Sequence, residues 1–147
     1  MSVPSEFRSV LKDGDPKCPD ENANPRIVVL FGPHVLKKGC LHAYTIEAMR
    51  EIEEGIRQLP RGSKQREVAS RTILSRTWEA EIDRDGRIVL PKERREAIGL
   101  EGEATMVAMG EYFEIWNADR YAEQEQEVFD DILEEYGEDF DPLSLLP

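Results

Sequence analysis

Apolar residues follow a strand-like pattern in several parts of this chain of 147 residues. The nearly continuous apolar run over residues 26–31 (RIVVLF) predicts a buried strand that Gly32-Pro33 ends, and residues 40–44 predict a second strand. Trp78, Ala80 and Ile82 alternate with polar residues, as in a half-buried strand. Residues 103–109 and 112–116 predict a hairpin around Gly110.

Other segments have the spacing of helices. Pro4 suits the start of a short helix up to Leu11, after which a Pro- and Asn-rich stretch predicts a loop over residues 12–25. Thr45 can cap a helix with apolar residues at Ile46, Met49, Ile52 and Ile56. After a break at residues 60–63, residues 64–74 predict a further helix. Asn117 can cap a last, acidic helix whose apolar positions are Tyr121, Ala122, Val128, Phe129, Ile132 and Leu133.

The stretch Asp83 to Gly99 combines a turn, a strand and a helix in a few residues. Asp83, Asp85 and Gly86 are turn formers, because a short carboxylate bonds nearby backbone N–H groups and glycine accepts positive φ. Residues 88–90 predict a short strand. Pro91 then suits the start of a helix that Gly99 ends.

The N-terminus carries a partial copy of this stretch. An offset of 87 pairs Val3-Pro4 with Leu90-Pro91 and Arg8 with Arg95, and the order strand, helix, strand, strand, helix then occurs twice. Two such halves, each too small to bury its own apolar face, predict one intertwined domain with pseudo-twofold symmetry. The same offset places the first turn before Met1. We therefore expect the true start codon to lie upstream, with an in-frame D-x-x-G-R between it and Met1; the alternative is that the first half has lost its turn.

Charge is distributed unevenly along the chain. The net charge is −12, but residues 117–147 hold eleven acidic residues and one basic, which leaves −2 for residues 1–116. Residues 83–95 contain five basic and three acidic residues, so this stretch is locally basic. An apolar membrane span or signal segment is not found, which predicts a cytoplasmic protein, and Cys18 and Cys40 are expected to be reduced thiols.

Metal sites and catalysis find little support in the sequence. His34, Cys40 and His42 are candidate ligands, but their spacing matches no zinc signature, so we predict no metal and no cofactor. The D-x-D-G at Asp83 lacks the further ligands of a calcium loop. A catalytic constellation is not evident, which predicts that the protein is not an enzyme. The aromatic residues are expected in the core, namely Trp78, Phe113, Trp116 and Phe129.

Four motifs together resemble the MraZ family: residues 83–91 (DRDGRIVLP), 113–116 (FEIW), 59–63 (LPRGS) and 140–146 (FDPLSLL). The resemblance implies an α+β fold of two pseudo-symmetric AbrB-like swapped-hairpin β units, which form one intertwined, barrel-like domain with connecting and C-terminal helices. On this basis we expect a first repeat over residues 1–48, a helical connector over 49–76, a second repeat over 77–120 and an acidic tail over 121–147.

The same resemblance implies a bacterial transcription regulator that forms a ring-shaped homo-oligomer at the nucleoid. Such a protein binds repeated double-stranded DNA sites upstream of its own division and cell-wall gene cluster. It implies that Arg87 faces DNA, where the guanidinium fork suits phosphate or guanine edges. Candidate phosphate contacts are Arg84, Lys92 and Arg94, while Asp83, Asp85 and Gly86 are expected to organise the turn. The alternative is an oligomeric scaffold or protein-interaction module without DNA binding.

Overall fold

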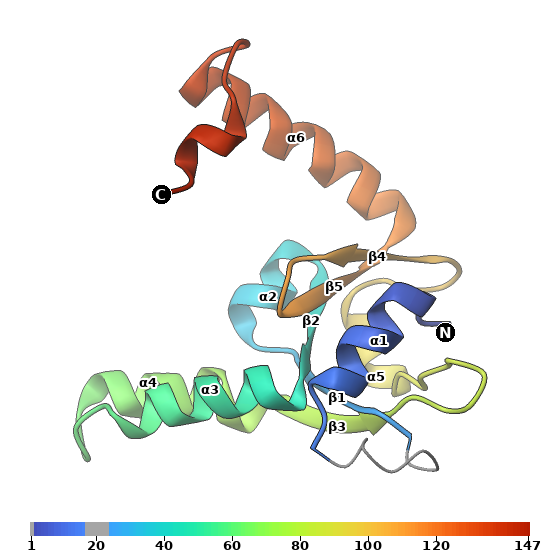
Figure 1. The fold of residues 1–147 in the computed structure, drawn as a ribbon, viewed down its shortest axis with the longest axis vertical. Coiled ribbons are helices and arrows are strands. Elements are labelled where there is room, and N and C mark those ends of the chain that lie inside the picture. The colour runs from blue at the N-terminus through green and yellow to red at the C-terminus, as the bar shows by residue number, and fades with distance from the viewer. Residues whose placement is uncertain (1, 17–23) are drawn as a thin grey trace. The chain divides into compact units, whose positions relative to one another are not determined.

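The computed structural model describes residues 2–16 and 24–147. Cys18 and half of the loop predicted over residues 12–25, namely residues 17–23, lie outside these ranges. The chain forms two compact units, Met1–Asn117 and Ala118–Pro147. The first unit contains the whole sheet, and the second contains a long helix and a short 3₁₀ turn (Figure 1).

Helices and strands are interspersed along the chain. In chain order they are α1 (Ser5–Asp13), β1 (Arg26–Leu30), α2 (Pro33–Lys38), β2 (Cys40–Thr45), α3 (Ile46–Arg57), α4 (Lys64–Thr72), η1 (Leu74–Arg76), β3 (Thr77–Glu81), α5 (Lys92–Ala97), β4 (Ala104–Ala108), β5 (Tyr112–Asn117), α6 (Ala118–Tyr136) and η2 (Pro142–Leu145). The α+β class predicted from sequence is therefore confirmed. Among the described helices, none combines the length and apolar character needed to cross a bilayer.

One antiparallel sheet of five strands joins the two halves of the sequence. Its order is β3-β1-β2-β5-β4, so the β1–β2 pair of the first half meets the β4–β5 hairpin of the second half along β2 and β5. In this central pairing Cys40 lies opposite Trp116 and Tyr44 opposite Tyr112. His42 and Glu114 pair at the middle of the ladder. A local twofold axis that passes between His42 and Glu114 would relate β2 to β5 in this register.

The apolar core lies on one face of the sheet. Leu41 and Ala43 of β2 point into it together with Phe113 and Ile115 of β5, and all four are buried. Helix α1 packs on this face, where the ring of Phe7 stacks on that of Phe113 with centroids 5.0 Å apart. Residues Val3, Leu11, Ile82, Ile88, Leu90 and Ile98 complete the cluster. Both halves of the repeat therefore contribute to one core.

The predicted core aromatic residues behave in two ways. Phe113 and Trp116 are buried, and Trp78 is half-buried and packs against the core. Phe129, however, is 54% exposed, so its predicted core position is wrong. Its helix, α6, belongs to the second unit, and the apolar residues of that helix stay exposed. Helical spacing indicates an apolar side, but it does not indicate whether another surface covers that side.

The other face of the central strand pair is polar and aromatic. Cys40, His42 and Tyr44 alternate with the core residues of β2, and Tyr112 and Glu114 lie across from them on β5. Burial lowers the pKa of the His42 imidazole, and the Glu114 carboxylate offsets this only in part, so the ring is neutral near pH 7. Burial likewise raises the pKa of the Tyr44 and Tyr112 phenols.

Local signals in the sequence account for most helix ends. The Thr45 hydroxyl accepts a hydrogen bond from the Ala48 N–H at 3.0 Å, so the predicted cap of α3 is confirmed. Pro4 and Pro91 occupy equivalent positions just before α1 and α5, with nearly identical backbone angles. Helix α2 was not predicted, because its six residues are too few to show a helical period.

The strand predicted over residues 88–90 is wrong. The structure assigns no strand to this segment, and the neighbouring Arg87 forms an isolated bridge with Ser2. The alternation that suggested the strand is nevertheless present, because Ile88 and Leu90 are buried whereas Val89 is 84% exposed.

A buried ion pair anchors the start of β1 to the end of α1. Both Asp15 carboxylate oxygens accept hydrogen bonds from the Arg26 side chain, at 2.7 and 3.0 Å, and one also accepts from the Arg26 backbone N–H at 2.9 Å. The Asp15 side chain is fully buried. Breaking such a pair leaves an uncompensated buried charge, which costs more than the pair itself contributes.

We expect Asp15→Asn to lower the free energy of unfolding by about 3 kcal/mol, because the Arg26 guanidinium would remain in place without its counter-charge. Glu79→Gln is the matched control, since the Glu79 carboxylate contacts the same arginine at 3.4 Å but is largely exposed. That control should cost less than about 1 kcal/mol. Urea denaturation of the three proteins measures both values, and equal losses would contradict the structural role given to Asp15.

Candidate nucleic-acid interface

The turn between β3 and α5 is held by the side chain of its first residue. Asp83 Oδ1 accepts hydrogen bonds from the backbone N–H groups of Asp85 and Arg87, both at 2.9 Å. The Asp83 carbonyl accepts from the Gly86 N–H at 3.0 Å, and the Asp83 N–H donates to the Arg87 carbonyl at 3.0 Å. These bonds define a three-residue loop of the type I turn and αL-glycine kind. The carboxylate of Asp83 is thus used within the turn.

Gly86 connects this turn to the N-terminal segment of the chain. Its φ of +74° lies in the left-handed region, which favours glycine. The Gly86 carbonyl accepts a hydrogen bond from the Val3 N–H at 2.6 Å, next to the bridge between Ser2 and Arg87. The guanidinium of Arg8 lies directly over Gly86, where a methyl group would overlap it. The second-half turn therefore packs against the first half of the chain.

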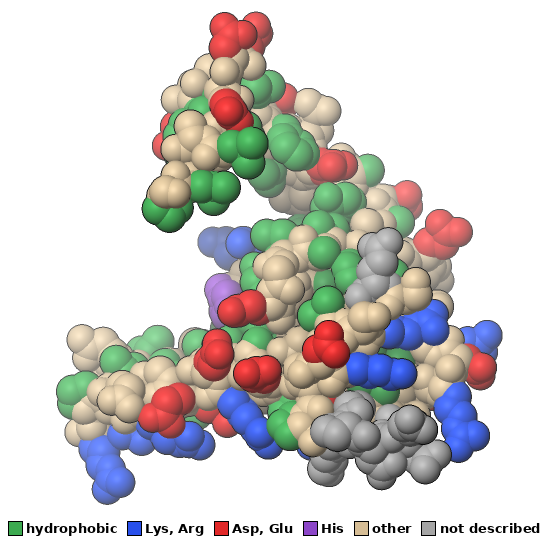
Figure 2. Space-filling model, in the orientation of Figure 1, with side chains coloured by type: hydrophobic (Ala, Val, Ile, Leu, Met, Phe, Trp, Pro, Cys, Tyr) green, Lys and Arg blue, Asp and Glu red, His purple; other side chains and the backbone are tan. Residues whose placement is uncertain are grey.

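Arg84 and Arg87 are exposed on this turn. Asp83 and Asp85 are also exposed, but Asp83 directs its oxygen at the backbone of the loop. In Figure 2, Lys and Arg side chains gather over α1 and the loop after β3, whereas the surface of α6 carries many acidic side chains. A guanidinium on a hydrogen-bonded loop starts from a restricted backbone, so less entropy is lost when it binds a phosphate or a base edge.

The two candidates on α5 differ in their surroundings. Lys92 is exposed, and its ammonium lies 3.8 Å from the Glu96 carboxylate one turn later. Arg94 is half-buried, and its guanidinium carbon lies 3.5 Å from the centre of the Phe31 ring and 5.9 Å from that of Trp78. This stacking is a cation–π contact that fixes the side chain against β1 and β3. Arg94 thus has a packing role that the sequence did not indicate.

A hollow of about 640 Å³ lies beside the segment that follows the turn. Val89 and Leu90 line one part of it, and Glu101 and Glu103 line another. Carboxylates at this position repel phosphate. Arg95 lines the hollow as well, so both signs of charge are present there.

Comparison with known proteins gives a consistent result. The profile of a family described as "MraZ protein, putative antitoxin-like" matches residues 73–137. A protein of Ruegeria pomeroyi named "Transcriptional regulator MraZ" is 38% identical over 146 residues, which cover 99% of this chain and 86% of that protein. The chain belongs to the MraZ family. A relative of the same name from Ligilactobacillus salivarius is 38% identical, covering 91% of this chain and 85% of its own length. Another relative of that name, from Polaromonas sp., is 29% identical over 95% of this chain and 88% of its own length.

The match to the MraZ profile includes the whole of the candidate interface. Residues 73–137 contain β3, the Asp83 turn, α5 and the β4–β5 hairpin. The resemblance drawn from the sequence motifs is therefore confirmed at the level of the family. The roles assigned to Arg84, Arg87, Lys92 and Arg94 stay predictions.

Sequence reasoning missed one residue of this MraZ-family turn. Arg8 is half-buried, donates from Nε to the Val3 carbonyl at 2.9 Å and covers Gly86. The repeat alignment paired Arg8 with Arg95, and this was the available signal. It showed that the position recurs, but a contact 78 residues away along the chain is visible only in the folded structure.

We expect Gly86→Ala to destabilise the protein by about 2 kcal/mol, because alanine is strained at positive φ and its methyl group displaces Arg8. Gly62→Ala separates the two effects: Gly62 has a φ of +75° but no atom within 4 Å of the added methyl group. It should cost only about 1 kcal/mol. Thermal unfolding measures both changes. Equal losses in the two variants would show that the packing of Arg8 on the turn contributes nothing.

Proposed function

We propose that this chain is a transcription regulator that binds double-stranded DNA through the turn between β3 and α5, with Arg87 as its main contact. The observation that carries the proposal is the exposure of Arg84 and Arg87 on a loop that Asp83 holds by hydrogen bonds to its backbone. The relatives support the regulatory role, since they are named as transcriptional regulators and not as enzymes.

The distribution of charge is compatible with DNA binding in spite of the net charge of −12. Residues 118–147, which form the other unit, carry a net charge of −10, so the unit that carries the turn has a net charge of only −2. Arg84 and Lys92 would contact phosphates, and Arg87 would read a base edge or a phosphate as a bidentate fork. Arg94 contributes by keeping α5 against β1 and β3, and its cation–π contact leaves it less free to reach DNA.

We also propose that the fold consists of two AbrB-like swapped-hairpin units. Three features support it: the β2–β5 register, the pairing of Ser2 with Arg87, and the equivalent positions of Pro4 and Pro91. We propose repeats over residues 1–48 and 77–120, with residues 49–76 as the connector and 121–147 as the acidic tail. The bridge between Ser2 of the first repeat and Arg87 of the second joins the backbones of the two repeats.

We further propose that the protein acts as a ring-shaped homo-oligomer on repeated sites upstream of its own division and cell-wall gene cluster, at the nucleoid. Several turns on one ring would bind repeated sites together, so that modest single contacts add through effective concentration. An exposed apolar stripe on α6 is available to contact a neighbouring protomer; it consists of Val128, Phe129, Ile132, Leu133 and Tyr136. This stripe is also the observation that favours the second candidate, an oligomeric scaffold without DNA binding.

A gel-shift titration at two stated salt concentrations tests the DNA-binding proposal. The full chain should bind the region upstream of its gene more tightly than a random duplex of equal length, and binding should weaken as salt increases. Arg87→Ala should reduce the affinity by at least about tenfold, which corresponds to one lost bidentate contact. Arg84→Ala should weaken binding to specific and random DNA alike, because a phosphate contact is insensitive to sequence.

Arg61→Ala is the matched control, because it removes the same charge from an exposed position between α3 and α4. It should leave the affinity unchanged, and size-exclusion chromatography should show the same oligomer for all variants. If the chain binds its upstream region no better than random DNA, the regulator proposal fails. If it oligomerises without any DNA binding, the scaffold is the better account.

A further inference from the structure

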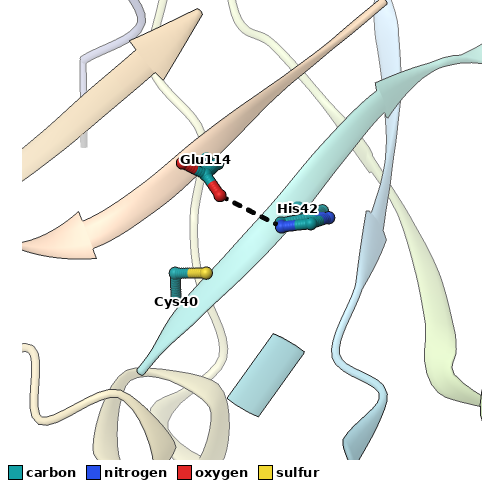
Figure 3. Close-up of side chains that lie close together, drawn as sticks. All are labelled: Cys40, His42 and Glu114. Carbon is teal, nitrogen blue, oxygen red and sulfur yellow. Dashed lines mark ion pairs between the residues drawn. The ribbon is translucent and has the colours of Figure 1, made fainter. Parts of the chain in front are cut away.

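Three side chains that can ligate a metal lie together on the polar face of the central strand pair. Cys40 and His42 are two residues apart on β2, and Glu114 lies opposite His42 on β5. One ligand atom from each residue lies within 4.8 Å of the other two. Figure 3 shows the three side chains on the same side of the two strands, with the carboxylate of Glu114 directed toward the imidazole of His42.

The imidazole of His42 is unsatisfied in this environment. The residue is 7% exposed, and neither ring nitrogen has a hydrogen-bond partner among the residues that the structure describes. Nε2 lies 3.3 Å from Glu114 Oε2, but the pair is not aligned as a hydrogen bond. A buried polar group without a hydrogen-bond partner destabilises the folded state. A buried nitrogen of this kind, next to a thiol and a carboxylate, suits a ligand that accepts its lone pair.

We propose that Cys40, His42 and Glu114 bind a zinc ion between the two halves of the sheet. Zinc accepts sulfur, nitrogen and oxygen ligands together, at about 2.0–2.3 Å, so its ligands lie about 3–4 Å apart. The ligand atoms now lie within 4.8 Å of one another, so they would have to move closer together on binding. A water molecule completes the tetrahedron, as is usual for zinc with three protein ligands.

The ligand set also balances charge and protons. A Cys40 thiolate and a Glu114 carboxylate carry two negative charges, which neutralise a divalent cation, while His42 binds as the neutral ring. The Cys40 thiol lies 3.8 Å from the Val35 carbonyl, to which it donates only weakly. On binding, its proton passes to solvent and the sulfur lone pair to the metal, so about one proton is released per ion. Magnesium and calcium are disfavoured, because they require oxygen ligands.

The position gives the proposed ion a structural role. It would cross-link β2 of the first half to β5 of the second half, at the middle of the ladder that joins them. The sequence predicted no metal because Cys40 and His42 alone match no zinc signature. The third ligand is 72 residues away from His42 in the sequence and reaches it only through the β2–β5 register.

Cobalt titration of the reduced full chain tests the site, because Co²⁺ replaces zinc and is coloured. One equivalent should produce a sulfur-to-cobalt absorption band together with the strong visible bands of a tetrahedral ion, and zinc should abolish both. Zinc should also raise the thermal unfolding midpoint, since the metal binds only the folded site. Absence of the sulfur band in the wild-type protein would overturn the proposal.

Variants locate the site. Cys40→Ser should lose the sulfur band, whereas Cys18→Ser, which removes the other thiol of the chain, should keep it. Glu114→Gln should weaken zinc binding at least about tenfold. Persistence of the band in a folded Cys40→Ser protein, or its loss in Cys18→Ser, would overturn the assignment. Circular dichroism checks folding; if Cys40→Ser does not fold, unchanged affinity in Glu114→Gln overturns it instead.

Discussion

The pairing of β2 with β5 is the constraint on which the rest of the structure depends. Each half supplies a strand pair whose apolar face is too small to form a core alone, and the central ladder brings the two faces together. Leu41 and Ala43 then share one cluster with Phe113 and Ile115. Because the register alternates faces, the same ladder places Cys40, His42 and Glu114 on the opposite side.

The turn between β3 and α5 depends on both halves as well. Asp83 fixes its backbone from within, but Val3 and Arg8 pack on it from the first half. The exposed arginines therefore project from a loop supported on two sides. This support explains how a loop can present a defined surface, since a side chain on an ordered backbone loses less entropy when it binds.

The two units differ in net charge. The last thirty-one positions hold eleven acidic residues and one basic, while the four arginines and one lysine of residues 83–95 lie in the unit that carries the sheet. The pI of about 4.7 for the whole chain consequently describes neither surface. A local potential, and not the net charge, decides whether a polyanion can approach a given face.

The sequence by itself determined the local elements and the family. Turn residues, caps and alternating apolar positions predicted the sheet strands, the Thr45 cap, and the turn and helix between Asp83 and Gly99, because such signals depend on neighbours in the chain. The tertiary structure alone decided the contacts between distant residues: Arg94 on Phe31, Arg8 on Gly86, and Glu114 beside His42. It also decided that residues 88–90 are not a strand of the sheet and that Phe129 is exposed, since sheet pairing and burial depend on distant residues that local sequence does not specify.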